Sequence, residues 1–480
     1  MPESPGNTYF LIIDQGTSST KCFLFNSEND VVFSQRIKHQ LNRPKPNHVE
    51  CDAQAIADTC RKLIYQSVQF SRENAGIIQS AGLAAQRSTF LFWDKETGKP
   101  LTPALSWQDS RARREVERRA AQSSFIHQQA GIPLSEHFGG PKYAYLTRHD
   151  PALKEKINRG DIWFGPLSAF LTHQLTGKAL VDHSIAGRSL LLNVDSLQWD
   201  DKLCDLFEVN SSCLPPLRPT LDHFGYINDF NFPLNCVIGD QQAALIGQGG
   251  IEEYFMAMNF GTSGSVLMNT GSTPIHNEGL LNNILFSDTN NKTYLTEGSI
   301  NACNALFYWL EEKLNIPHQD MVWDVRCRNT HVDGALVPGF SGLAAPYWKN
   351  GFESIYHHLE NASANEWIRA GMESIGFLVY DILNEMPKKN ASGLVPAGGG
   401  AARDPLLQFI SDMTGLNIGH STMKDRTAFG VNYLLKKYTG ESIDFPGIDS
   451  DMIFKPTMDD ELRIEKLKNW RVALGKLGLS

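Results

Sequence analysis

The same short pattern, a strand, a Gly-Thr-Ser turn and a second strand, occurs once in each half of the chain. The first copy is YFLIID (9–14), QGTSST (15–20) and KCFLF (21–25), and the second is YFMAMN (254–259), FGTSGS (260–265) and VLMNTG (266–271). Gly16 and Gly261 are 245 positions apart, which is too far for the unit of a solenoid. The repeat therefore predicts two related domains, each with a turn rich in hydroxyl groups.

Strands and helices alternate along the rest of the chain. The pattern predicts strands at residues 77–84 and 90–93, and helices at residues 110–121, 151–157, 301–313, 364–386 and 405–414. This alternation favours an α/β fold, in which helices cover the sheets. Because 480 residues are too many for one core, we expect two abutting domains, residues 1–246 and 247–480, with a cleft between them.

Composition excludes several classes of protein. Hydrophobic residues make up 41% of the chain and charged residues 20%, which is typical of a globular protein. The formal net charge of −9 gives no long-range attraction to nucleic acid or to a membrane surface. The basic segment RARREVERR (111–119) is interpreted as a solvated helix face, with Arg111–Glu115 and Arg113–Glu117 pairs.

Targeting signals are also absent from the sequence pattern. Residues 1–8 have no basic start followed by an apolar run, and no segment approaches 18 apolar residues. The eight cysteines are scattered, without metal-ligand spacing, and are interpreted as reduced thiols. We therefore expect a cytoplasmic protein; the sequence is compatible with a homodimer but does not define the oligomeric state.

The two Gly-Thr-Ser turns are candidate phosphate-binding elements. Gly-Thr-Ser also makes an ordinary hairpin turn, so one copy alone leaves both interpretations open. Two copies in the same strand context favour phosphate binding. Asp14 ends the strand before the first turn, where a carboxylate could orient Mg²⁺ through water, although Asp is also a common turn former. Lys21 follows the turn and could reach a phosphate.

Asp240 is the candidate general base. It lies in VIGDQQAALIGQ (237–248), where an apolar strand runs through Gly-Asp into an Ala-rich helix. Either this Asp caps the helix, or it accepts the proton of a substrate hydroxyl group. This motif alone does not separate the two roles.

A third glycine-rich turn, PAGGGAARDPLLQF (396–409), opens a helix near the end of the second half. Its glycines would let the backbone approach a ligand closely, and the amides at the start of the helix favour an anion or a nucleotide. A plain tight turn explains the pattern equally well, and the sequence is not that of a P-loop.

Taken together, the motifs resemble the FGGY carbohydrate kinases and most closely their glycerol kinase branch. The resemblance runs from about Tyr9 to about Gly440 and is carried, in order, by DQGTSSTK, HVECDAQAI, LAAQRSTFLFWDKETGKPL, ALSWQDSR, GDQQAALIGQ, GTSGSVLMNTG, PGFSGLAAPYW and GGGAARDPLLQF. It implies two actin-like, ribonuclease H-like ATPase domains with a catalytic cleft between them. It also implies ATP and Mg²⁺ as cofactors.

The resemblance assigns a role to each candidate residue. Asp240 would be the catalytic base and Asp14 a magnesium-associated carboxylate. The residues placed around the nucleotide and its phosphates are Thr17, Ser18, Ser19, Lys21, Gly261, Thr262, Asn304, Tyr308, Gly399 and Arg403. The residues placed around the acceptor are Arg87, Ser88, Trp107, His137, Asp240, Gln241 and Ser265.

This chain departs from the glycerol kinase pattern on both sides of the site. On the acceptor side, Ser88 replaces a glutamate, His137 a tyrosine and Ser265 a phenylalanine. These changes predict a pocket for a longer, more polar acceptor such as a pentose, a ketose or a larger polyol. On the nucleotide side, the replacements are Asn304 for a glycine, Tyr308 for a glutamine, Arg403 for an asparagine and Ala397 for the aspartate before the paired glycines.

The sequence therefore predicts an ATP-dependent kinase acting on a hydroxyl group of a small sugar or polyol. The alternative is a non-catalytic sugar-binding or regulatory protein, whose altered nucleotide pocket at Asn304, Tyr308 and Arg403 no longer supports turnover. An actin-like ATPase that moves or polymerises is disfavoured, because Arg87, Trp107 and Asp240 together indicate a small-molecule pocket.

Overall fold

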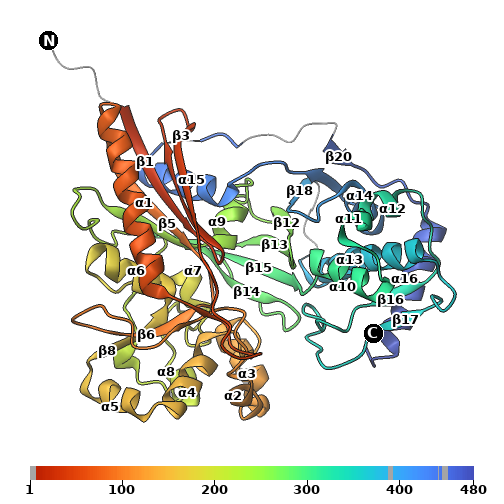
Figure 1. The fold of residues 1–480 in the computed structure, drawn as a ribbon, viewed down its shortest axis with the longest axis horizontal. Helices are drawn as coiled ribbons and strands as arrows, with labels where there is room; N and C mark the ends of the chain where they lie inside the picture. The colour runs from red at the N-terminus through yellow and green to blue at the C-terminus, as the bar shows by residue number, and fades with distance from the viewer. Residues whose placement is uncertain (1–6, 388–392, 442, 446–451, 480) are drawn as a thin grey trace.

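Two mixed β-sheets, one built from each half of the chain, organise the molecule (Figure 1). The computed structural model describes residues 7–387, 393–441, 443–445 and 452–479. Within them, the first sheet has the order β11 (Leu234–Gly239), β5 (Gly76–Ala85), β1 (Asn7–Gln15), β2 (Ser19–Phe25), β3 (Val31–Lys38). The second has the order β14 (Leu281–Ser287), β15 (Lys292–Ile300), β13 (Gly264–Gly271), β12 (Met256–Phe260), β18 (Leu394–Gly398), β19 (Asn417–His420), β20 (Ile453–Phe454).

The two sheets share a five-stranded topology, to which the second sheet adds β14 and β20 at its edges. In the first, β1 pairs antiparallel with β2 and β2 with β3, while β5 lies parallel to β1 and β11 parallel to β5. In the second, β12, β13 and β15 form the same antiparallel run, and β18 and β19 extend it in parallel. The predicted α/β class with a duplicated domain is confirmed.

Helices cover these sheets, and smaller sheets lie at the periphery. The helices of the first half are α1 (Ala53–Glu73), α2 (Arg113–Glu117), α3 (Ser123–Ala130), α4 (Gly139–His149), α5 (Pro151–Arg159), α6 (Leu167–Thr176), α7 (His183–Ala186), α8 (Asp201–Leu206) and α9 (Asp240–Ile246). Those of the second half are α10 (Asn304–Leu314), α11 (His318–Met321), α12 (Trp323–Arg328), α13 (Ala364–Glu385), α14 (Asp404–Thr414), α15 (Arg426–Thr439) and α16 (Asp460–Gly475). The remaining strands are β4 (Glu50–Cys51), β6 (Phe90–Asp94), β7 (Ala104–Leu105), β8 (Ile162–Pro166), β9 (Val181–Asp182), β10 (Leu217–Arg218), β16 (Ala335–Val337) and β17 (Ile355–His357).

Each Gly-Thr-Ser segment forms the turn of a hairpin. The Gly16 amide donates to Ser19 O at 3.0 Å, and the Gly261 amide donates to Ser263 O at 2.9 Å. The first turn is shorter than predicted, since Ser19 and Thr20 already belong to β2 and are buried. These strands form because β-branched and aromatic residues fill both faces of a sheet that is covered by helices.

One helix of the second half packs on the sheet of the first half. α15 lies against β1, β5, β11 and α9 and joins their hydrophobic core. The backbones of α9 and α15 approach so closely that a Cβ atom at Gly430 would collide with Ala243 O. The predicted division of the chain at Ile246 stays a prediction.

The basic segment differs from its predicted form. α2 spans only Arg113–Glu117, and Glu115 is buried and bonded to Arg118, Arg119 and Arg148. The expected Arg111–Glu115 pair is wrong, because Arg111 instead binds Glu50 and Asp109. The Arg113–Glu117 pair forms on the surface, at 3.6 Å.

Two smaller predictions concern cysteines and membranes. All eight cysteines are buried and free, as expected of reduced thiols. None of the helices that the structure describes combines the length and apolar character that crossing a bilayer requires.

Candidate active site

Asp240 lies at the junction of β11 and α9, and its carboxylate is partly open to solvent. The cap position before the helix is Gly239, and no side chain caps it, so the interpretation of Asp240 as a helix cap is wrong. Asp240 Oδ1 accepts a hydrogen bond from the backbone N–H of Gln241 at 2.8 Å and lies 3.6 Å from Arg87 Nε. The side chain remains 26% exposed. Burial raises the pKa of Asp240, and Arg87 opposes that rise.

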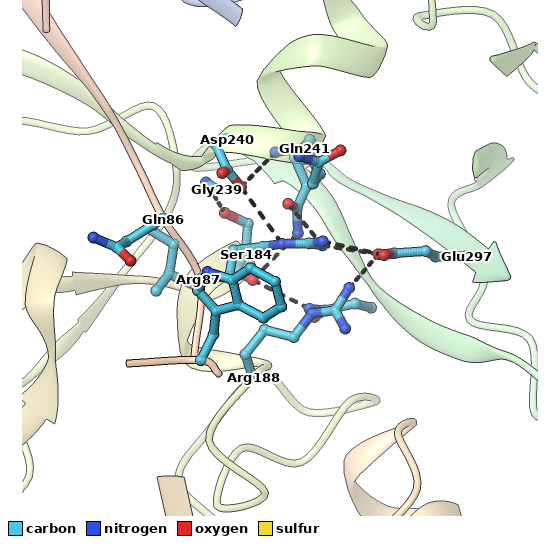
Figure 2. A network of polar contacts seen from close by, with 12 residues as sticks. Gln86, Arg87, Ser184, Arg188, Gly239, Asp240, Gln241 and Glu297 are labelled. Atoms are coloured by element: carbon cyan, nitrogen blue, oxygen red, sulfur yellow. Dashed lines mark hydrogen bonds and ion pairs between the residues drawn. The ribbon is translucent and has the colours of Figure 1, made fainter. Parts of the chain in front are cut away.

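Arg87 is held by an acidic residue from the other half of the chain (Figure 2). Its Nη1 lies 2.8 Å from Glu297 Oε2, and its Nη2 lies 3.1 Å from Glu297 Oε1. Arg188 also pairs with Glu297, and Arg87 Nη1 donates to Gln242 Oε1 at 3.3 Å. Two guanidinium groups thus share one carboxylate on β15.

The charges of this cluster set the state of Glu297. Burial alone would raise the pKa of Glu297, but the adjacent Arg188 and Arg87 outweigh burial and lower it to about 2. Glu297 is therefore an anion at neutral pH and holds Arg87 beside Asp240. This arrangement leaves Arg87 Nε directed toward the Asp240 carboxylate (Figure 2).

The backbone after Arg87 is held by a buried lysine. Ser88 adopts a left-handed conformation with φ 61°. Its carbonyl accepts from Lys142 Nζ at 2.6 Å, and Ser106 O accepts from the same ammonium group at 2.8 Å. Burial lowers the pKa of Lys142 to about 7. Lys142 thereby joins the Arg87 segment to the segment that carries Trp107.

Trp107 connects the candidate acceptor pocket with the first hairpin turn. Its Nε1 donates to Thr17 Oγ1 at 2.9 Å, and its side chain is 39% exposed. His137 Nδ1 is buried and has no hydrogen-bond partner in the described part of the chain. Burial lowers the pKa of His137, which favours the neutral imidazole.

Ser265 lies on the same sheet face as Glu297. It is buried on β13 and pairs with Ser299 of β15, two positions along from Glu297. Residues opposite each other on antiparallel strands share a face, as do residues two positions apart. The sheet thus places Ser265 beside the Arg87–Glu297 cluster, whereas no hydrogen bond within the described residues joins Ser265 or His137 to Arg87.

The first hairpin turn presents its hydroxyl groups unequally. Thr17 and Ser18 lie in the turn itself and are at least partly exposed, whereas Ser19 is buried in β2. Lys21 Nζ lies 2.5 Å from Asp425 Oδ1, so an acidic residue of the second half holds the lysine that was predicted to reach a phosphate.

The chemistry around Asp14 fits a water-mediated divalent cation. Burial raises the pKa of Asp14 to about 6; Lys21 opposes this rise, while the negative charges of Asp240 and Asp425 add to it. Among the described residues, no group of three or more His, Cys, Asp or Glu side chains could hold a metal directly. Mg²⁺ usually keeps several waters and is bound by one or two carboxylates plus phosphates, which matches a lone Asp in an acidic surrounding.

The second hairpin turn, the glycine-rich turn and the start of α10 lie together. The backbone N–H of Asn304 donates to Gly261 O at 3.0 Å, and the backbone N–H of Cys303 donates to Thr262 O at 2.9 Å. A Cβ atom at Gly400 would lie 3.0 Å from Asn304 Nδ2, so the Asn304 side chain borders the glycine-rich turn. Gly399, with φ 105°, allows this turn to approach the second hairpin.

The other two nucleotide-side residues are exposed. Tyr308 lies one turn after Asn304 on α10 and is 51% exposed. Arg403 is exposed immediately before α14. Within the described part of the chain, no hydrogen bond joins the first hairpin turn directly to the second.

Sequence reasoning missed several residues of this site. Glu297 and Asp425 were not among the candidates, although each contacts one that was, and Arg188, which was also missed, pairs with Glu297. Glu297 lies 210 positions from Arg87 and Asp425 lies 404 positions from Lys21, so only the fold brings them together. An acidic residue in a strand that also holds Tyr294, Leu295 and Ile300 was the one signal available for Glu297.

Comparison with known proteins identifies the two halves. Residues 9–247 match the model of the N-terminal domain of the FGGY family of carbohydrate kinases, and residues 256–435 match that of its C-terminal domain. The chain is 30% identical to glycerol kinase of Thermococcus kodakarensis over 97% of its own length and 96% of that protein. It is 31% identical to glycerol kinase 1 of Thermotoga maritima, covering 98% of this chain and 99% of that protein.

Solved structures agree. The crystal structure of Plasmodium falciparum glycerol kinase with ADP superposes with a TM-score of 0.88 at 27% identity, covering 99% of each chain. The structure of a ligand-bound xylulose kinase from Lactobacillus acidophilus shares the fold, with a TM-score of 0.85 at 19% identity, covering 98% of this chain and 97% of that one. The chain belongs to the FGGY family of carbohydrate kinases and is a phosphotransferase that acts on a hydroxyl group.

Proposed function

We propose that this kinase transfers the terminal phosphate of ATP to a hydroxyl group of a sugar or polyol that is larger and more polar than glycerol. A pentose, a ketose or a larger polyol would fit. The observation that carries the proposal is the partly exposed Asp240 carboxylate, held beside Arg87 by the Gln241 amide and by the Glu297 cluster. Its surroundings resemble a base facing an alcohol.

In this proposal, Asp240 accepts the proton of the acceptor hydroxyl. The acceptor oxygen then forms a bond to the terminal phosphorus while the bond from that phosphorus to the bridging oxygen breaks, and ADP leaves. Arg87 would donate hydrogen bonds to acceptor hydroxyl groups and Trp107 would cover the acceptor's C–H face. Gln241 would contribute a further polar contact. The Glu297 carboxylate keeps Arg87 in position for this role.

The acceptor class follows from side-chain size and polarity. At three positions where glycerol kinases are expected to have glutamate, tyrosine and phenylalanine, this chain has Ser88, His137 and Ser265. Each replacement removes bulk, and His137 brings a buried nitrogen without a protein partner. In this proposal, a longer acceptor would fill the space that the smaller side chains leave.

The donor side of the proposal uses both hairpin turns. Thr17, Ser18, Lys21, Gly261 and Thr262 would surround the phosphates, with Ser19 supporting the first turn from its buried position. Asn304, Tyr308, Gly399 and Arg403 would surround the nucleoside. Asp14 would hold Mg²⁺ through water, and the metal supplies positive charge to the phosphate oxygens. In this division, residues 1–246 would carry the acceptor pocket and the first phosphate hairpin, and residues 247–480 would carry the second phosphate hairpin and the nucleotide site.

A coupled assay of ADP release tests the proposal. The kinase would be presented with Mg²⁺-ATP and a panel of acceptors: glycerol, four- and five-carbon polyols, ketopentoses and aldopentoses. We expect acceptor-stimulated ADP release with a five-carbon ketose or polyol at a kcat/KM at least about tenfold above that for glycerol. Preference for glycerol would refute the acceptor assignment, and ADP release unaffected by every acceptor would refute the transfer itself.

A further inference from the structure

Arg426 carries a positive charge that no acidic side chain within the described residues neutralises. It is the first residue of α15 and is half-buried. In the described part of the chain, its one hydrogen bond runs from Nη1 to Gln248 Oε1, at 2.9 Å. Burial lowers the pKa of Arg426, and no neighbouring charge offsets this effect. A guanidinium group has five N–H donors, so most of its donors are left for another partner.

The guanidinium group of Arg426 lies against the first glycine of the glycine-rich turn. A Cβ atom at Gly398 would lie 2.6 Å from Arg426 Nη2 and 2.9 Å from Nη1. Any other side chain at position 398 would therefore displace this group. Gly398 ends β18 and pairs with Asn259 of β12, which leads directly into the second hairpin turn. Arg426 is thus a neighbour of the backbone that would cradle the nucleotide.

The residue before Arg426 reaches the other hairpin. Asp425 binds Lys21 at 2.5 Å, so two consecutive residues at the start of α15 contact the first hairpin and the glycine-rich turn. Arg426 borders Gly398 of the glycine-rich turn, so in the proposed function it lies on the donor side of the site.

Local charge also favours an anion at this place. The residue before the paired glycines is Ala397, which carries no charge. The charge of Arg426 is therefore not offset at this position. A guanidinium group suits phosphate because its planar fork donates two parallel hydrogen bonds.

We infer that Arg426 binds phosphate oxygens of the donor nucleotide that remain in ADP after transfer. This inference rests on the proposed function, in which the glycine-rich turn faces the nucleotide. Arg426 would then be a phosphate-binding residue that lies outside the two Gly-Thr-Ser turns. The competing role is a purely structural one, in which Arg426 only ties α15 to Gln248, two residues after α9.

Calorimetric titration with ADP in the presence of Mg²⁺ separates these roles. The proteins would be wild type, Arg426→Gln, Arg426→Lys and the matched control Lys437→Gln, which removes an exposed positive charge from the same helix. We expect Arg426→Gln to weaken ADP binding about 10- to 100-fold, the size of a lost charge-assisted contact. Arg426→Lys should weaken it less, and Lys437→Gln should stay within about threefold of wild type.

Thermal unfolding of the ligand-free proteins completes the test. An Arg426→Gln protein that melts near the wild-type temperature but binds ADP weakly supports the inference. ADP affinity within about threefold of wild type in both Arg426 variants overturns it while leaving the proposed function intact. If Arg426→Gln does not fold, the affinity of Arg426→Lys decides in the same way. A wild-type protein that binds no ADP overturns the proposed function and this inference together.

Discussion

Lys21 Nζ lies 2.5 Å from Asp425 Oδ1, which joins the first hairpin to the start of α15. Both side chains are about one-third exposed, at 30% and 37%. Exposed ion pairs of this kind contribute about 0.2–1 kcal/mol to folding stability. The contact therefore contributes little to folding stability, and we predict instead that Lys21 acts on the ligand, as in the proposed function.

Substitution of Lys21 should separate activity from stability. Lys21→Met is expected to lower kcat/KM for ATP by about 100-fold or more, because a phosphate loses its cationic partner. The free energy of unfolding should change by less than about 1 kcal/mol. Asp425→Asn, which breaks the same pair but keeps the lysine, should retain activity within about tenfold. Equal losses of activity in the two variants would show that the pair itself, and not the lysine, is required.

Among the buried residues of the site, substitution of Glu297 should cause the largest loss of folding stability. Glu297→Gln leaves Arg87 and Arg188 without their shared carboxylate, and we expect a loss of about 3–5 kcal/mol of folding stability. Urea unfolding measures this loss. Glu312→Gln, an exposed substitution on α10, should stay within about 0.5 kcal/mol of wild type. A Glu297→Gln protein as stable as this control would contradict the account of the cluster.

The contribution of Glu297 to folding stability should decrease as the pH falls. Its pKa is about 2 in the folded protein and 4.5 in its unperturbed state, so the unfolded chain takes up the proton first as the pH falls. The stabilisation is therefore complete above about pH 4.5 and is lost as the pH falls toward 2. The stability difference between wild type and Glu297→Gln should shrink over this range, and a constant difference would contradict the assignment.

Three substitutions together should shift the acceptor preference toward glycerol. The combined variant carries Ser88→Glu, His137→Tyr and Ser265→Phe, which restores the side chains expected in glycerol kinases. We expect its kcat/KM ratio of glycerol to the preferred acceptor to rise by about tenfold or more. The three single variants and the melting temperature serve as controls for folding. An unchanged ratio in a folded triple variant would show that other residues set the acceptor.

Removal of the divalent metal should abolish transfer, and Asp14 should set how much metal is needed. Asp14→Asn is expected to raise the Mg²⁺ concentration for half-maximal activity by about tenfold, since in the proposed function the carboxylate would orient the water shell of the ion. The measurement is a Mg²⁺ titration of ADP release at saturating ATP. An identical Mg²⁺ requirement in the variant would place the ion elsewhere.

The duplicated architecture could be predicted from the sequence because it depends on short local sequence patterns. Apolar, β-rich segments flanking Gly-Thr-Ser occur twice, and both form hairpins at the predicted places. Predicted helices such as 364–386 and 405–414 were also found within one residue of their bounds. Local patterns were sufficient here, because the apolar side of each strand or helix packs against a single sheet or core.

Partners from distant parts of the chain could not be predicted. Glu297 and Asp425 are single acidic residues whose roles arise only when the two sheets and α15 come together. The same limit explains the error at Glu115: helical spacing suggested a surface pair with Arg111, but Arg148 from another helix covers this carboxylate. Sequence spacing identifies possible pairs along one helix. It does not show whether another element buries one of the side chains and supplies a different partner.

Asp240→Asn tests the central claim most directly. Acceptor-stimulated ADP release would be measured for wild type and the variant, together with ADP affinity to show that the donor site is intact. We expect a fall in kcat of at least about 100-fold with ADP affinity unchanged, because an amide cannot accept the hydroxyl proton. Full activity in the variant would contradict the account of Asp240 as the base.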